Sequence, residues 1–418
     1  MVILKKVKIF DHQSPYHLQV KDIYIAKGKI EKIADRIDHI EGAKTIESGQ
    51  LSCSPGWVDI GTQVGEPGLE HRETLQSIVE AARVGGYTGI APFPNTIPVL
   101  QTKAAVKTLL DFAASSKMNI YPIASATIDC RGIDLSEMYD LHKGGAVAYS
   151  DGLKPIQHNG VLRNALNYVK AFNGLIIHFP QDEHLASGGH MHEGETSTYL
   201  GMKGIPAMAE HITLRRDMAL VEYTESRMCI YGISSKESVK IIKDYKHLKL
   251  TSTVPYLNLI KDDQALKDFD SNLKVSPPLR NKKDMNELIK GLKEDTITAI
   301  VSNHYPLDEE NKKLEFTYAK FGASGIETVF PALNTYLKGK LDIQTIVRKL
   351  SYGSREILNL AQPIIKEGEQ ADMTLFDAEA AWEYSQTKSL SKNNPFLVQE
   401  FTGKVIGTIV NGKVFVNG

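Results

Sequence analysis

Residues 55–68 have the outline of a strand that carries a metal site, but the residues that would bind the metal are missing. The run 57–60 is short and apolar with one acid, and Pro-Gly pairs bound it, as expected of a strand that ends at a tight loop. Side chains two residues apart on a strand point the same way, so positions 61 and 63 would project together. Two imidazoles there would begin a zinc site. The chain has Gly61, which offers no ligand, and Gln63, whose neutral amide is a poor one.

A second pair with the same spacing does carry imidazoles, at His190 and His192. This spacing would allow both rings to contact one metal ion. The pair falls in the glycine-rich stretch 188–192, however, and such stretches are typical of surface loops. We therefore favour a surface-loop position over a metal site.

The elements that would position such groups alternate along the middle of the chain. Helix-like stretches at 74–84, 103–115 and 236–243 are each followed by a short apolar run typical of a strand. Strand–helix alternation over roughly 300 residues predicts an α/β fold, a (β/α)₈ barrel whose reactive groups lie at the C-terminal ends of its strands.

Both ends of the chain show β patterns instead. Residues 2–54 contain short alternating runs, and the run 404–410 turns at Asn411-Gly412 into 413–416, which is a strong hairpin signal. The Lys- and Asn-containing segment 388–394 is predicted to be a surface loop.

Taken together, these segments resemble the dihydroorotases of the cyclic amidohydrolase family, of the type associated with aspartate transcarbamoylase. In that family the first segment contains Asp-X-His-X-His-X-Arg-Glu-Pro-Gly. The resemblance implies a barrel over 55–360 and a small β-sandwich domain built from 1–54 and 361–418. It covers nearly the whole chain through the motifs at 70–74, 81–88, 94–96, 193–195, 204–210, 276–280, 321–328 and 371–372.

The resemblance also implies a zinc site assembled from several barrel strands. Gly61 and Gln63 stand where the family has its paired histidines, and Gly232 lies in a segment that has lost two more. Asp151 and His178 match an Asp and a His ligand and are the surviving candidates. Each also has a structural interpretation, Asp151 as a turn cap and His178 as a core histidine with protein partners. We expect no metal, or at most one residual ion.

The family's general base and substrate contacts are altered too. Asn303 replaces the Asp of Asp-His-Ala-Pro-His, and an amide cannot cycle a proton near pH 7. Gly65 replaces an Arg and Ser276 an Asn that hold the orotate carboxylate and ring, whereas Asn95 and Arg280 are kept. Losing the Arg removes the strongest kind of carboxylate contact that a protein offers. Such losses, on an intact scaffold, are the pattern of a pseudoenzyme.

The composition excludes some classes of partner and of chemistry, but it does not identify a function. The formal net charge is −1 with no basic block, which gives a nucleic-acid or acidic-membrane partner no electrostatic support. Cys53, Cys130 and Cys229 are scattered, so we expect buried thiols rather than disulfides. No stretch reaches membrane-spanning length, and we expect a cytoplasmic protein that forms a homo-oligomer.

Three hypotheses follow. The first is a non-catalytic dihydroorotase homologue of pyrimidine biosynthesis that assembles with aspartate transcarbamoylase. The second is an active cyclic amidohydrolase with a reduced or relocated metal site, using Asp151, His178, His304 and one of His190 or His192. The third is a small-molecule binding module that uses Asn95 and Arg280 at the barrel mouth.

Overall fold

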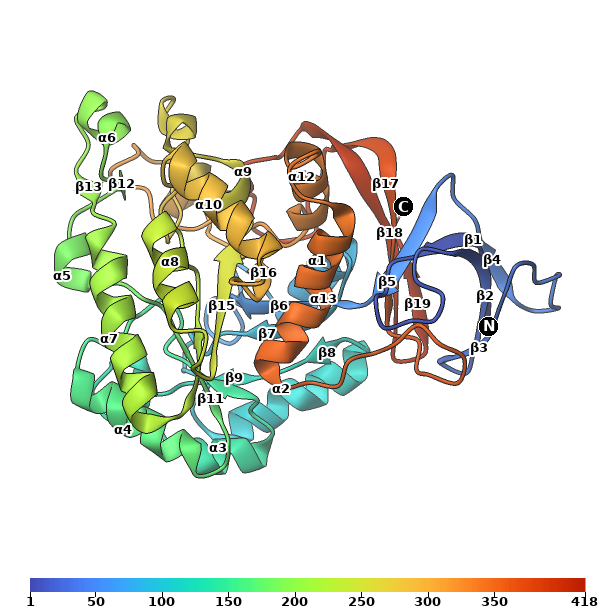
Figure 1. Ribbon diagram of the computed structural model, residues 1–418, viewed down its shortest axis with the longest axis horizontal. Coiled ribbons are helices and arrows are strands. Elements are labelled where there is room, and N and C mark those ends of the chain that lie inside the picture. Colours follow the sequence, from blue (N-terminus) through green and yellow to red (C-terminus); the bar gives the residue numbers. More distant parts are fainter. Residues whose placement is uncertain (418) are drawn as a thin grey trace.

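The computed structural model describes residues 1–417, which form a barrel with a smaller β domain beside it (Figure 1). The N-terminal strands and the last three strands lie together in the smaller domain, at the right of Figure 1. The predicted fold class, an α/β barrel with a β domain built from both termini, is confirmed.

Within residues 57–301 the paired barrel strands are all parallel. Strands β8 and β9 pair with opposite neighbours and are separated only by Tyr121-Pro122, so they act as two halves of one barrel strand. The strands are β6 (Trp57–Thr62), β7 (Tyr87–Pro92), β8 (Asn119–Ile120), β9 (Ile123–Ala124), β10 (Ala148–Tyr149), β11 (Leu175–His178), β14 (Arg227–Ile230), β15 (Leu250–Pro255) and β16 (Ala299–Val301).

Asp59 closes the barrel where its first and last strands meet. Its carboxylate accepts hydrogen bonds from the backbone N–H and the hydroxyl of Ser302, at 2.7 and 2.6 Å, and from the Thr62 hydroxyl at 2.5 Å. The side chain is fully buried, and burial raises its pKa. The two donors of Ser302 therefore join β6 to the residue that follows β16, and Thr62 contacts the carboxylate from within β6.

Helices follow most barrel strands and cover the barrel's outside. Thr74 caps α1 and exchanges hydrogen bonds with Ser77 in a capping box, which fixes the start of the predicted helix 74–84. The predicted helices at 103–115 and 236–243 are likewise confirmed. The helices are α1 (Leu75–Val84), α2 (Lys103–Ser116), α3 (Met138–Gly144), α4 (Asn159–Lys170), α5 (Glu183–Ala186), α6 (Glu195–Tyr199), α7 (Met208–Thr224), α8 (Lys236–Asp244), α9 (Leu257–Ile260), α10 (Lys282–Lys293), α11 (Glu309–Lys312), α12 (Val329–Tyr336) and α13 (Ile343–Leu358).

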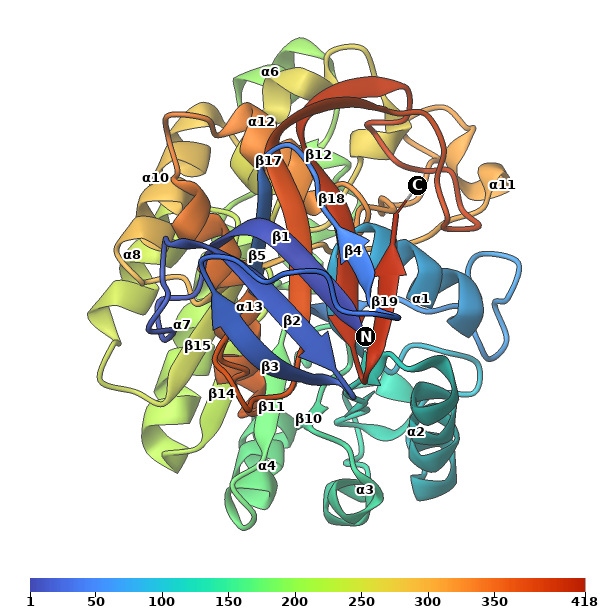
Figure 2. The same ribbon diagram turned by 90° about the vertical axis from the view of Figure 1, so that its right-hand side faces the viewer.

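Among residues 1–417 the smaller domain is one eight-stranded sheet, and Figure 2 views it face on. Strand β5 joins its two halves, because it pairs in parallel with β1 and antiparallel with β17. The strands are β1 (Val2–Ile9), β2 (Val20–Ala26), β3 (Lys29–Ala34), β4 (Lys44–Ile46), β5 (Leu51–Pro55), β17 (Met373–Tyr384), β18 (Gln399–Val410) and β19 (Lys413–Val416). The predicted hairpin at Asn411-Gly412 is confirmed, as is the burial of the three free cysteines.

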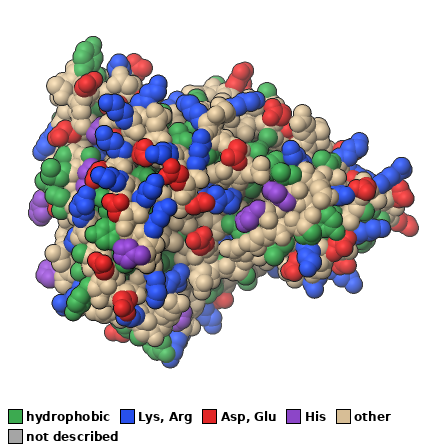
Figure 3. All heavy atoms as spheres, in the orientation of Figure 1, with side chains coloured by type: hydrophobic (Ala, Val, Ile, Leu, Met, Phe, Trp, Pro, Cys, Tyr) green, Lys and Arg blue, Asp and Glu red, His purple; other side chains and the backbone are tan. Residues whose placement is uncertain are grey.

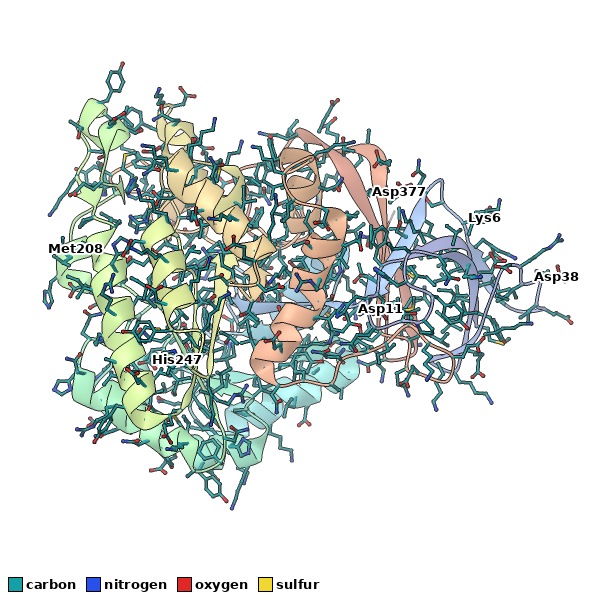
Figure 4. All side chains as sticks on the ribbon, in the orientation of Figure 1. Lys6, Asp11, Asp38, Met208, His247 and Asp377 are labelled. Carbon is teal, nitrogen blue, oxygen red and sulfur yellow. The ribbon has the colours of Figure 1, made fainter. Side chains whose placement is uncertain are left out.

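Buried polar groups join the two domains. The Arg355 guanidinium, 1% exposed, donates to the carbonyl of Gly56 and to the Asp372 carboxylate. Asp11, labelled in Figure 4 near the junction, accepts hydrogen bonds from the Tyr352 hydroxyl at 2.6 Å and the Ile365 N–H at 2.8 Å. Charged and hydrogen-bonded groups therefore connect β1 and β17 to the last barrel helix.

The prediction of a surface loop at 388–394 is wrong in part, because four of its residues are buried. The segment connects β17 to β18 and lies against two buried carboxylates of the barrel. Glu73 accepts hydrogen bonds from the Ser389 hydroxyl and the Leu390 N–H, and Glu327 accepts from the N–H groups of Lys388 and Ser389. The polar composition of this segment therefore reflects buried hydrogen bonding at four positions as well as exposure at Lys388 and Lys392.

The surface carries both signs of charge. Figure 3 shows basic and acidic side chains intermixed over the visible face, in keeping with the net charge of −1. Among residues 1–417, no helix combines the length and the apolar run that a membrane crossing requires.

The closure at Asp59 gives a first prediction. Asp59→Ala leaves the donors of Ser302 and Thr62 buried without an acceptor, and the free energy of unfolding should fall by about 2–4 kcal/mol. Urea unfolding followed by circular dichroism measures the change. Asp111→Ala, at an exposed position of α2, is the matched control and should stay within about 0.5 kcal/mol of the parent. Equal effects of the two substitutions would contradict the role of Asp59.

Candidate functional site at the barrel mouth

Two aromatic rings fill the barrel mouth, which is the region at the C-terminal ends of the barrel strands. Phe93 follows β7 and Tyr231 follows β14, and both are buried. Their ring centroids lie 4.9 Å apart in an edge-to-face contact. A Cβ atom added at Gly61 would lie 2.6 Å from the Tyr231 ring and 2.7 Å from the Phe93 ring, and Gly61 has a φ of +82°. The rings therefore occupy the space into which a side chain at 61 would extend.

Positions 63 and 65 of the same segment are also surrounded by protein atoms. Gln63 is buried, and its N–H donates to the carbonyl of His304 at 2.9 Å. A Cβ atom at Gly65 would lie 2.3 Å from the carbonyl oxygen of Leu69 and 2.4 Å from that of Glu73. Backbone atoms cannot give way as a flexible side chain can, so position 65 has no room for an arginine in this loop conformation.

His178, at the end of β11, uses both ring nitrogens within the protein. Its Nε2 accepts a hydrogen bond from the Ile156 N–H at 3.0 Å, which places the ring proton on Nδ1. Nδ1 then donates to the buried carboxylate of Asp217 at 2.8 Å. Arg216 contacts the other oxygen of the same carboxylate. The interpretation of His178 as a core histidine with protein partners therefore describes its geometry, and its acceptor lone pair is already engaged.

Asp151 holds a loop in a similar way. Its carboxylate accepts hydrogen bonds from the N–H groups of Ala126 and Thr127, at 3.1 and 2.9 Å, and from the Thr127 hydroxyl. Burial raises its pKa, and the hydrogen bonds from Thr127 act in the opposite direction. The Asn95 amide donates to the Asp151 carbonyl at 3.0 Å, so these two predicted site residues lie side by side.

Asn303 and Ser276 also meet at the mouth. The Asn303 amide donates to the Ser276 carbonyl at 3.0 Å, and its oxygen lies 3.5 Å from the Tyr231 hydroxyl. Gly232 follows Tyr231 and adopts a φ of +75°. The structure thus brings Gly61, Gly232, Ser276 and Asn303 to one place, where they surround a tyrosine rather than a cluster of charged ligands.

Arg280 lies in a separate buried network. Its guanidinium contacts the Glu210 carboxylate at 3.3 Å, the Ser234 hydroxyl at 2.8 Å and the His192 ring at 3.1 Å. Glu210 also accepts hydrogen bonds from Ser234, Ser235 and Ser238. These contacts pair the positive charge of Arg280 with a carboxylate of the protein.

The surface-loop prediction fails for His192, which lies in the short strand β12 (Met191–His192) beside β13 (Gly204–Ile205) and is buried. Burial, with a smaller effect of Arg280, lowers its pKa to about 4. His190 precedes this strand and lies 3.4 Å from the Lys274 ammonium, so the two imidazoles have different partners.

His304 contacts a carboxylate that the sequence analysis did not identify as part of the site. Its Nδ1 accepts hydrogen bonds from the N–H groups of Gly325 and Ile326, and its Nε2 lies 3.4 Å from the Glu73 carboxylate. The 3.4 Å contact falls outside hydrogen-bond geometry, and Nε2 has no hydrogen-bond partner. Glu73 therefore links His304 to Ser389 of the β17–β18 connection.

The residues present do not fit the zinc site that the family resemblance implies. Of its ligand positions, Gly61 and Gly232 carry no side chain, and the His178 lone pair accepts from Ile156. Among residues 1–417, no group of three or more His, Cys, Asp or Glu side chains is arranged to hold a metal ion. Zinc binds through three or four such groups.

The residues missed by the sequence analysis are the aromatic pair. Phe93 directly precedes the Pro94-Asn95-Thr96 turn, and Tyr231 directly precedes Gly232. A large aromatic residue at the end of a barrel strand, next to a position where glycine replaces a ligand, is the signal that could have identified Tyr231.

Gly61→Ala should destabilise the fold by about 3–5 kcal/mol, because the added methyl group meets two rings and the residue must keep a left-handed conformation. The matched control is Gly339→Ala, where φ is +80° and no atom lies within 4 Å of the added Cβ. In Gly339→Ala the free energy of unfolding should fall only by the conformational cost, about 1–2 kcal/mol. Urea unfolding compares the two, and equal losses would show that the rings do not crowd position 61.

His192 gives a prediction on pH. Its folded-state pKa of about 4 lies below the ordinary 6.5, so between these pH values the unfolded chain takes up a proton that the folded chain does not. Stability should therefore fall as the pH drops from 6.5 to 4, by up to about 3 kcal/mol from this group. The difference in unfolding free energy between pH 7 and pH 4.5 should shrink in His192→Gln but not in His39→Gln, at an exposed position. An unchanged pH dependence in His192→Gln would contradict the assignment.

Comparisons with known proteins agree with this architecture. A family model described as Dihydro-orotase-like matches residues 51–238. A dihydroorotase of Syntrophus aciditrophicus is 35% identical over 421 residues, which cover 99% of this chain and 98% of the relative. A dihydroorotase of Acetivibrio thermocellus is 37% identical over 405 residues, 95% of each chain.

Among solved structures, an L-hydantoinase from Arthrobacter aurescens is similar with a TM-score of 0.85 and 22% identity, over 99% of this chain and 95% of that one. This likeness supports the fold, and the relatives that match along their whole length identify the family. The chain belongs to the dihydroorotase family of amidohydrolases.

Proposed function

We propose that this chain is a non-catalytic dihydroorotase homologue of pyrimidine biosynthesis that acts as a structural partner of aspartate transcarbamoylase. The observation that carries the loss of catalysis is the packing of Phe93 and Tyr231 against Gly61. Membership of the dihydroorotase family supports the homologue part of the proposal, and the packing of the two rings supports the loss of catalysis.

The chemistry of the family's reaction supports the same proposal. Opening or closing the dihydroorotate ring requires a polarised amide carbonyl and a deprotonated nucleophile near neutral pH, and metal ions supply both. Asn303 stands in the position of the general base, and its amide is held by the Ser276 carbonyl. With neither a fitting ligand set nor a base, the mouth lacks the groups that the reaction needs.

The assembly part of the proposal rests on the type of dihydroorotase that the chain resembles. Replacements are concentrated at the mouth, whereas the hydrogen bonds of the barrel closure at Asp59 and of the domain junction at Arg355 are in place. A scaffold retained without its reactive groups is suited to binding another protein through its surface. We propose that this chain forms a homo-oligomer, and that this homo-oligomer is the species that binds aspartate transcarbamoylase.

Metal analysis and turnover test the catalytic part. Protein purified without added zinc should contain well under one equivalent of metal and should not convert dihydroorotate or carbamoyl aspartate. The Acetivibrio thermocellus relative, assayed in parallel, is the reference for the assay. Stoichiometric zinc together with turnover would overturn the proposal in favour of an active enzyme with a relocated site.

Co-migration tests the assembly part. The chain mixed with the aspartate transcarbamoylase of the same organism should elute earlier from a sizing column than either protein alone. Separate elution at micromolar concentrations would reject this partner while leaving the catalytic result unaffected.

A further inference from the structure

A cavity of about 540 Å³ lies between the barrel and the smaller domain, away from the residues of the mouth. Its walls come from α1, the start of α12 and the strands β17, β18 and β19. Figure 2 shows β19 beside α1 at this junction. Its volume falls within the range of about 300–1,000 Å³ that small-molecule sites occupy, and such sites often lie between domains.

Two of the three cations that line this cavity, Arg83 and Lys388, form no ion pair among residues 1–417. Arg83 of α1 donates to the Ser116 carbonyl and stacks on the Phe415 ring at 3.7 Å, and its Nε is buried with no hydrogen-bond partner. Lys388 is exposed, and only its backbone N–H makes a hydrogen bond. The ion pairs within residues 1–417 include neither side chain. An anion placed between them would supply the missing charge partner.

Burial lowers the pKa of the Arg83 guanidinium and the charge of Glu80 opposes that shift, but neither acid of the cavity forms an ion pair with these cations. The Glu327 carboxylate accepts hydrogen bonds from Thr387, Lys388 and Ser389, all within the β17–β18 connection, and burial raises its pKa. Glu80, on the exposed side of α1, accepts from the Gln76 amide. Their contacts are therefore local.

An aromatic surface forms another wall. The Trp382 indole N–H donates to the Gly403 carbonyl at 2.8 Å, which satisfies its polar atom. The ring is half-buried and lines the cavity together with Phe415. An indole with a satisfied N–H offers a flat apolar face, which favours a planar ligand.

We propose that this cavity binds a small planar anion, an aromatic or heteroaromatic ring that carries a carboxylate or a phosphate. The anionic group lies between Arg83 and Lys388, and the ring lies against Trp382. The site is independent of the barrel mouth and of the proposed assembly role, so either can fail without the other.

Calorimetry and tryptophan fluorescence on the full chain test the proposal. Benzoate and phenyl phosphate should bind saturably, cyclohexanecarboxylate more weakly and benzylamine not at all. The chain has two tryptophans, and Trp57 is 0% exposed, so a fluorescence change on binding should report Trp382 and vanish in Trp382→Phe. Tighter binding of benzoate or of phenyl phosphate identifies which anionic group the site prefers.

A matched pair of lysine variants tests the charge assignment. Lys388→Gln should weaken benzoate binding by about fivefold, because one ion pair is lost. Lys392→Gln, an exposed position of the same connection outside the cavity, should leave it unchanged. Arg83→Gln should weaken binding further, with folding checked by circular dichroism.

The proposal is overturned if neither benzoate nor phenyl phosphate binds the folded protein at millimolar concentration. It is also overturned if Lys388→Gln and Lys392→Gln behave alike, or if benzylamine binds as well as benzoate.

Discussion

The rings of Phe93 and Tyr231, which meet edge to face, occupy the space beside Gly61 at the barrel mouth, and the arrangement of the other residues there depends on this contact. A buried cluster of imidazoles and carboxylates is stable when a metal ion balances it, and costly when nothing does. Here two rings fill that volume and Gly61 leaves room for them. The two rings and Gly61 are buried and pack against one another as apolar groups do in a protein interior.

Three of the polar residues kept from the family have partners within the chain, whereas Asn95 Oδ1 and His304 Nε2 are buried without a hydrogen-bond partner. His178 pairs with Asp217, Asp151 holds the loop at Thr127, and Arg280 pairs with Glu210. A half-satisfied polar network costs more than an apolar core. His178, Asp151 and Arg280 therefore have a structural reason to persist, independent of their role in active relatives.

The predictions of secondary structure were correct where they depend on residues that are adjacent in the sequence. The capped helix at Thr74 and the turn at Asn411-Gly412 depend on a few adjacent residues, so sequence pattern is sufficient. The replacements at Gly61 and Asn303 could also be located from motif order, and the structure places them around the same tyrosine. The packing of Tyr231 against Phe93 and Gly61 was not predictable, because it joins strands far apart in the chain. Likewise, the burial of Ser389 depends on Glu73, over three hundred positions away.

The connection between β17 and β18 has a consequence for how this chain can be divided. Glu73 and Glu327 belong to the barrel, yet several of their hydrogen-bond donors come from residues 387–390. A fragment that stops after α13 would lack these donors. The carboxylates of Glu73 and Glu327 would then have to bind water or take up protons. A barrel separated from the C-terminal strands is therefore incomplete in its own interior, because part of its buried hydrogen bonding comes from the connection between those strands.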